Sequence, residues 1–138
     1  MQRITRGRRP VLSKLEENDP QIDKEVDNLQ ITLGKKEDNF VIDSRLGFHF
    51  IPRSKKVFLD ADFEIRAKRI LSDCSRNENN PNLKKAMANI KAREKSEIAR
   101  YRQYYNVNPY DKKMFDFVID TTNSTSEQIT EKIILFIN

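Results

Sequence analysis

The sequence predicts an α/β fold in which helices flank a parallel sheet. Three short apolar runs end in polar residues, as buried parallel strands do, at residues 40–46, 56–61 and 115–122. Amphipathic helical patterns follow the second and third runs, at residues 63–72 and 126–137. Strands that alternate with helices in this way favour a parallel sheet.

Composition limits the class of protein. The 138 residues suffice for one domain, which we expect to span residues 1–138. The net charge of +5 suits nucleic acid, nucleotides or other phosphorylated partners without choosing among them. A single cysteine, Cys74, excludes a disulfide framework, and no apolar run reaches the length of a membrane helix. We therefore expect a cytoplasmic protein.

The remaining segments carry weaker signals. Residues 12–30 look helical with a break near Pro20, and residues 34–39 read as a turn. The apolar stripes expected to face the core are Ile22, Val26 and Leu29 in this helix and Ile129, Ile133, Ile134 and Ile137 in the last one.

A long helical pattern begins near Leu83. Its apolar side consists of Leu83, Met87, Ile90, Ile98, Tyr101 and Tyr105. A row of polar side chains borders that side, namely Arg93, Glu97, Arg100 and Tyr104, whereas Lys84, Lys91, Lys95 and Arg102 face water. Two guanidinium groups at such a border are placed to hold an anion. The alternative is a solvated face with a weak ion pair between Arg93 and Glu97.

Four motifs occur in a fixed order along the chain. They are Val-Ile-Asp-Ser-Arg-Leu at 41–46, Val-Phe-Leu-Asp-Ala at 57–61, Arg-Glu-Lys-Ser-Glu at 93–97 followed by Arg100-Tyr101, and Phe-Val-Ile-Asp-Thr-Thr at 117–122. Together they resemble the cytidylate kinase family, particularly its archaeal branch. The resemblance implies a three-layer P-loop kinase-like fold that transfers the γ-phosphoryl group of ATP, with Mg²⁺, to a nucleoside monophosphate. CMP, dCMP and UMP all remain open as acceptors.

The resemblance also implies roles near the acceptor. Arg93 and Arg100 resemble the arginines that contact the phosphoryl groups during transfer. Glu97 resembles the acidic residue that holds the acceptor nucleoside. The further expected ligands of the acceptor and its phosphate are Arg3, Asp43 and Arg45. For Arg3 a basic tail is the alternative interpretation.

Further residues are expected near the donor nucleotide. Arg69 resembles the arginine that stacks over adenine, with a solvated helix face as the alternative. Thr121 and Thr122 would lie beside the same base. Arg76 belongs to the expected lid, at about residues 73–83.

The sequence departs from the family at one important motif. The glycines are Gly7, Gly34 and Gly47, and they do not form the Gly-x-x-x-x-Gly-Lys-Ser/Thr pattern of a P-loop (Walker A loop). By resemblance, residues 1–33 are acceptor-binding helices, residues 1–4 lie inside the first of them, and the P-loop with its strand would precede Met1. We therefore expect negligible kinase activity from this chain alone.

The same departure predicts a gap in the sheet. In the family the first strand lies between the strands at Val41 and Val57, so its absence leaves edges that close, recruit a partner chain or self-associate. Two alternatives to a kinase stay open. One is a basic binding module for nucleic acid, which the position of Tyr101 and Tyr105 on the apolar side disfavours. The other is a degenerate relative that pairs with a complete chain.

Overall fold

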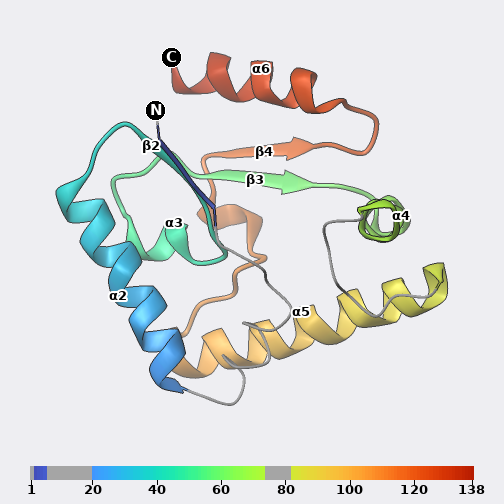
Figure 1. The fold of residues 1–138 in the computed structure, drawn as a ribbon, viewed down its shortest axis with the longest axis horizontal. Coiled ribbons are helices and arrows are strands. Elements are labelled where there is room, and N and C mark those ends of the chain that lie inside the picture. Colours follow the sequence, from blue (N-terminus) through green and yellow to red (C-terminus); the bar gives the residue numbers. More distant parts are fainter. Residues whose placement is uncertain (1, 6–19, 74–81) are drawn as a thin grey trace. The chain divides into compact units, whose positions relative to one another are not determined.

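A computed structural model describes residues 2–5, 20–73 and 82–138 (Figure 1). The chain divides into two compact units, Met1–Ser54 and Lys55–Asn138. In the described residues, each unit contains one pair of parallel strands together with helices. The predicted α/β class with parallel strands is confirmed.

The first unit is built around two short strands. Strand β1 (Gln2–Thr5) pairs in parallel with β2 (Phe40–Asp43), in a register that sets Gln2 opposite Phe40. The prediction that residues 1–4 lie inside a helix is therefore wrong for residues 2–4. The β-branched residues Ile4 and Thr5 favour extended backbone, and β2 offers an apolar strand with which to pair.

Helix α2 (Pro20–Lys36) is longer at its end than the sequence predicts. Gly34, expected in a turn, lies inside α2 and close to the residue that follows the short helix α3 (Gly47–Phe50). A Cβ atom on Gly34 would lie 2.9 Å from Cγ2 of Ile51. Glycine is therefore explained by the close approach of α2 to this segment, and the turn follows only after Lys36.

The buried face of α2 is polar. Asp27 and Gln30 are only 6% and 5% exposed, whereas Leu29 is 70% exposed. The predicted apolar stripe is therefore wrong at Leu29, because Gln30 and Gly34 face Ser44 and Ile51 instead.

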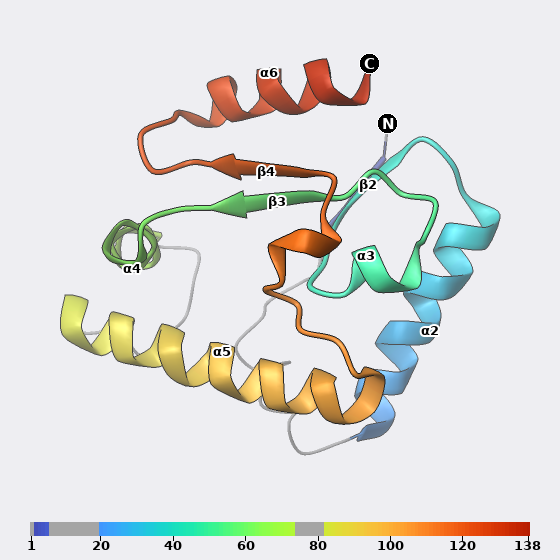
Figure 2. The same ribbon diagram turned by 180° about the vertical axis from the view of Figure 1, so that it is seen from behind.

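The second unit contains strands β3 (Val57–Asp60) and β4 (Phe117–Asp120), which pair in parallel with Asp60 opposite Asp120. Their carboxyl ends therefore meet at one edge of the pair. Helix α6 (Ser126–Ile137) follows β4 and lies beside it (Figure 1 and Figure 2). The ring of its Phe136 stacks on Phe117 with 4.8 Å between the ring centroids. Because Phe136 takes the inner position, Ile134 is 47% exposed, and its predicted place in the core stripe is wrong.

Helices α4 (Phe63–Ser72) and α5 (Leu83–Tyr105) pack against each other. Small side chains form their contact, with Ala67 and Ala86 0% and 1% exposed beside buried Ile90. Alanines let the two helix backbones approach closely, so α4 fixes the first half of α5. The 3₁₀ turn η1 (Lys112–Met114) lies between α5 and β4.

Helix capping explains the starting points of α5 and α6. The side chain of Asn82 accepts a hydrogen bond from the backbone N–H of Lys85, and Thr125 and Gln128 form a reciprocal capping box. Within residues 2–5, 20–73 and 82–138, no helix combines the length and the hydropathy needed to cross a membrane.

Candidate functional site

The polar row predicted on α5 lies beside its buried side. Glu97 is 3% exposed, as is Tyr101, and Arg93 and Arg100 are half-buried. The hydroxyl of Tyr110, which follows α5, donates a hydrogen bond of 2.5 Å to Oε2 of Glu97. A buried carboxylate thus lies along the helix between two arginines, one about a turn before it and one about a turn after it.

Arg100 is held by its neighbour on the helix. Its Nη2 donates to the hydroxyl of Tyr101 at 3.0 Å, and its guanidinium carbon lies 4.8 Å from the centre of the Tyr101 ring. A cation over an aromatic face gains electrostatic stabilisation from the ring. The phenol of buried Tyr101 therefore restricts where the Arg100 guanidinium can point.

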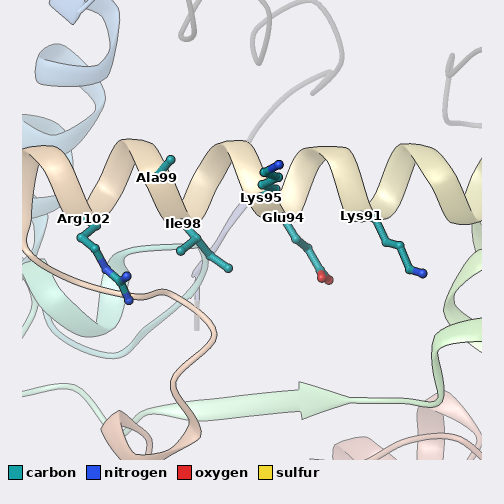
Figure 3. A pocket seen from close by; sticks show the side chains of 6 residues that line it. All are labelled: Lys91, Glu94, Lys95, Ile98, Ala99 and Arg102. Atoms are coloured by element: carbon teal, nitrogen blue, oxygen red, sulfur yellow. The ribbon is translucent and has the colours of Figure 1, made fainter.

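The opposite flank of α5 carries an open cavity of about 560 Å³ (Figure 3). Its lining consists of Lys91, Glu94, Lys95, Ile98, Ala99 and Arg102. None of the residues predicted to bind a nucleotide lines this cavity. Glu94 is engaged by Arg66 of α4 in an ion pair, whereas Lys91, Lys95 and Arg102 are exposed.

A second cluster lies at the carboxyl ends of β3 and β4. Arg69 of α4 donates from Nη1 to the hydroxyl of Thr121 at 2.8 Å and from Nη2 to the Thr121 carbonyl at 2.5 Å. Thr121 is 4% exposed, and its hydroxyl and backbone N–H each donate to the carbonyl of Asp60 at 2.7 Å. Because these bonds use the edge of the guanidinium, exposed Arg69 still offers its planar faces for stacking on a ring.

Asp120 lies at the same edge and is fully exposed. The hydroxyl of Thr122 donates to its Oδ1 at 2.6 Å and the backbone N–H of Thr122 at 3.0 Å. These two hydrogen bonds lower the pKa of Asp120 below its ordinary value; the bond from the hydroxyl has the larger effect and the bond from the backbone N–H the second largest. Thr122 also accepts a hydrogen bond from the backbone N–H of Asp62, which ties the edge to the start of α4.

The first unit contains the other predicted acceptor ligands. Asp43 ends β2, and the half-buried Arg45 follows Ser44. The Ser44 hydroxyl donates to Oε1 of the buried Gln30. Arg3 lies in β1 opposite Val41 in the strand register.

Other predictions have different outcomes. Arg76 lies outside the described residues, as does Cys74. Within the described part of the chain, no cluster of three or more histidine, cysteine or acidic side chains has a geometry for a metal ion.

Sequence reasoning missed three contacts that support these clusters: Tyr110 with Glu97, Gln30 with Ser44, and Arg66 with Glu94. No spacing rule links the first two pairs. The third follows from two helices whose packing the sequence does not specify. The predicted exposure of Lys84, Lys91, Lys95 and Arg102 is confirmed.

Comparison with known proteins gives a consistent result. The sequence model of the family described as cytidylate kinase matches residues 11–138. A cytidylate kinase of Methanobrevibacter smithii is 35% identical over 123 residues, which are 89% of this chain and 68% of that protein. One from Methanothermobacter thermautotrophicus is 32% identical over 83% of this chain and 68% of its own length. A third, from Sulfolobus acidocaldarius, is 34% identical over 89% of this chain and 66% of its own length.

The chain thus spans about two thirds of the length of these relatives. The match includes every described element from α2 to α6. The chain belongs to the cytidylate kinase family.

Proposed function

We propose that this chain carries the acceptor site of a nucleoside monophosphate kinase that transfers the γ-phosphoryl group of ATP to CMP or dCMP, and that it binds the acceptor while transferring little phosphoryl group alone. The observation that carries the proposal is the row on α5, where a buried Glu97 stands between Arg93 and Arg100 and is held by Tyr110. Arg93 and Arg100 contact the phosphoryl groups, because a guanidinium pairs two donors with two phosphate oxygens and keeps its charge. Glu97 accepts hydrogen bonds from the acceptor nucleoside.

Charge neutralisation is the main contribution that such residues make to phosphoryl transfer. The transition state spreads negative charge over the equatorial oxygens, and fixed cations stabilise that charge without moving. Arg93 and Arg100 are separated by seven residues, roughly 10 Å along the helix axis. Their long side chains span that distance and reach one phosphoryl group or two adjacent ones.

Within the first unit, Asp43 and Arg45 are proposed as ligands of the acceptor nucleotide. Arg45 binds its phosphate, and Arg3 is a second candidate for that role. Support comes from their place at and after the carboxyl end of β2, where open parallel sheets bind their ligands.

Donor binding is proposed for the cluster at the carboxyl ends of β3 and β4. Arg69 stacks on the adenine of ATP, since its hydrogen bonds to Thr121 hold the guanidinium plane in one orientation. Thr121 and Thr122 border the base, and Arg76 is proposed as a further ligand of the donor. Mg²⁺ is proposed to accompany ATP, where it would neutralise the donor phosphates.

The 138 residues contain no Gly-x-x-x-x-Gly-Lys-Ser/Thr motif. That motif supplies the amides and the lysine that hold the β- and γ-phosphates. We therefore expect the chain to bind CMP while showing negligible ATP-dependent formation of CDP. Isothermal titration calorimetry with CMP tests the first expectation, and a coupled assay of ADP release tests the second.

Two outcomes would redirect the proposal. Turnover in the ADP assay at the rate of a cytidylate kinase that contains the P-loop motif would contradict the expected inactivity. Oligonucleotide binding that weakens steeply with salt and is not displaced by CMP would favour a nucleic-acid module. The burial of Tyr101 argues against that module, because a buried ring cannot serve as a stacking platform for bases. A mass measurement in solution would test the proposed self-association of the chain.

A further inference from the structure

Gln30 is a buried amide of which only one half has a described hydrogen bond. Gln30 is 5% exposed, and its Oε1 accepts a hydrogen bond from the hydroxyl of Ser44. Its Nε2 is buried and has no hydrogen-bond partner among the described residues. A buried donor without an acceptor destabilises a protein by about 1–3 kcal/mol, and such groups are few in native structures. The missing acceptor therefore requires an explanation.

The surroundings of Gln30 point to a ligand. Ser44 lies between Asp43 and Arg45, directly after the carboxyl end of β2, a position where α/β proteins bind their ligands. On α2, Asp27 and Gln30 are turned inward while Leu29 is turned to water. Polar residues inside and an apolar residue outside reverse the ordinary pattern of a helix. Such reversals are expected at functional sites.

We propose that Gln30 determines specificity by donating a hydrogen bond from Nε2 to ring atom N3 of the acceptor cytosine. The inference rests on the proposed function and names the base that it selects. A phosphate is matched by the guanidinium of Arg45, whereas a neutral amide donor is matched by a neutral acceptor. N3 of cytosine accepts a hydrogen bond, but N3 of uracil carries a hydrogen. An amide N–H facing N3 therefore favours cytosine and leaves UMP with two donors in opposition.

The test uses the whole chain and three ligands: CMP, UMP and ribose 5-phosphate, which lacks the base. Gln30→Met keeps a similar volume and removes the donor. We expect the affinity for CMP to fall about tenfold, the affinity for UMP to rise because the opposed donor is gone, and the affinity for ribose 5-phosphate to change less than about twofold. Asn28→Met replaces an exposed amide on the same helix and should leave all three affinities unchanged.

A second variant protects the test against misfolding. Gln30→Glu keeps an acceptor for Ser44 and replaces only the donating group, so it should also lose the preference for CMP over UMP. An unchanged ratio of CMP to UMP affinity in both variants overturns the inference, as does an equal loss for all three ligands. If the unaltered chain binds no CMP, the inference and the proposed function both fail. If it binds CMP and only the ratio is unaffected, the inference alone fails.

Discussion

The two flanks of α5 carry similar charges in different surroundings. On one flank, Glu97 is 3% exposed and accepts a hydrogen bond from the Tyr110 hydroxyl. It lies between Arg93 and Arg100 along the helix. On the other, the charges of Lys91, Lys95 and Arg102 are exposed along an open cavity. The helix has the same backbone geometry on both sides, so the neighbouring segments create the difference.

This comparison teaches that a cation becomes a binding group through its surroundings. Water screens an exposed lysine and leaves its chain free to move, so its contribution to a specific contact is small. A half-buried arginine beside an aromatic ring or a fixed carboxylate has lost that freedom before the ligand arrives. A residue of the buried flank should therefore respond to substitution more strongly than a matched residue of the exposed flank.

The largest effect is expected from the arginines. Arg93→Gln and Arg100→Gln should each weaken CMP binding about 10- to 100-fold, because a hydrogen bond to a charged group contributes about 1.5–3 kcal/mol. Arg102→Gln, on the exposed flank, should change it less than about twofold. Calorimetry at fixed salt measures the three affinities. Equal losses at all three positions would mean that only the total charge of the helix matters.

The next effect concerns the support of Glu97. Tyr110→Phe removes one hydroxyl and leaves a buried carboxylate with one donor fewer, which should lower the free energy of unfolding by about 1–3 kcal/mol. Tyr104→Phe is the matched control, because Tyr104 is 47% exposed, and its effect should stay within about 0.5 kcal/mol. Urea unfolding measures both. Indistinguishable variants would show that the Tyr110 bond does not stabilise the buried flank.

A smaller effect is expected at the contact between α4 and α5. A double-mutant cycle on Arg66 and Glu94, which are 36% and 27% exposed, should give a coupling of about 1 kcal/mol. The i,i+4 pair of Glu64 and Lys68, each 57% exposed, should give about 0.3 kcal/mol. If the coupling between Arg66 and Glu94 is no larger than that between Glu64 and Lys68, the ion pair does not help to fix α5 on α4.

The smallest effect separates hydrogen bonding from burial. Asp120 is fully exposed, yet the Thr122 hydroxyl lowers its pKa, so Thr122→Val should raise that pKa toward its ordinary value. Since the folded pKa is depressed, the associated stability is present above the unfolded pKa and is lost as pH falls through the folded pKa. An NMR titration of the Asp120 carboxyl carbon measures the change. An unaltered titration midpoint would mean that the Thr122 backbone N–H and nearby cations, rather than the hydroxyl, lower the pKa of Asp120.

Local chemistry made much of the fold predictable. Helices α4 and α6 begin and end at the predicted residues, and α5 begins at Leu83, because apolar spacing and the caps at Asn82 and Thr125 act within one turn. The three apolar runs were recognised, although each strand is shorter than its run. The turn predicted at Gly34 is wrong, because the side chain that requires a glycine there belongs to Ile51, which is distant in the sequence.

The candidate site was predictable only in part, for the same reason. The row of Arg93, Glu97 and Arg100 follows from helical spacing along one segment. The contacts of Gln30 with Ser44 and of Tyr110 with Glu97 join residues 14 and 13 positions apart through loops. Loop conformation depends on tertiary packing, which a pattern of residue types does not encode.

The bond between Tyr110 and Glu97 also limits how the gene can vary in length. Helix α5 ends at Tyr105, Asn106 takes a left-handed conformation with φ 52°, and the chain then returns to the helix it has just left. One residue inserted between Glu97 and Tyr105 would rotate the carboxylate by about 100° relative to everything after it. We therefore expect insertions and deletions in related sequences to occur before residue 97 or after residue 110.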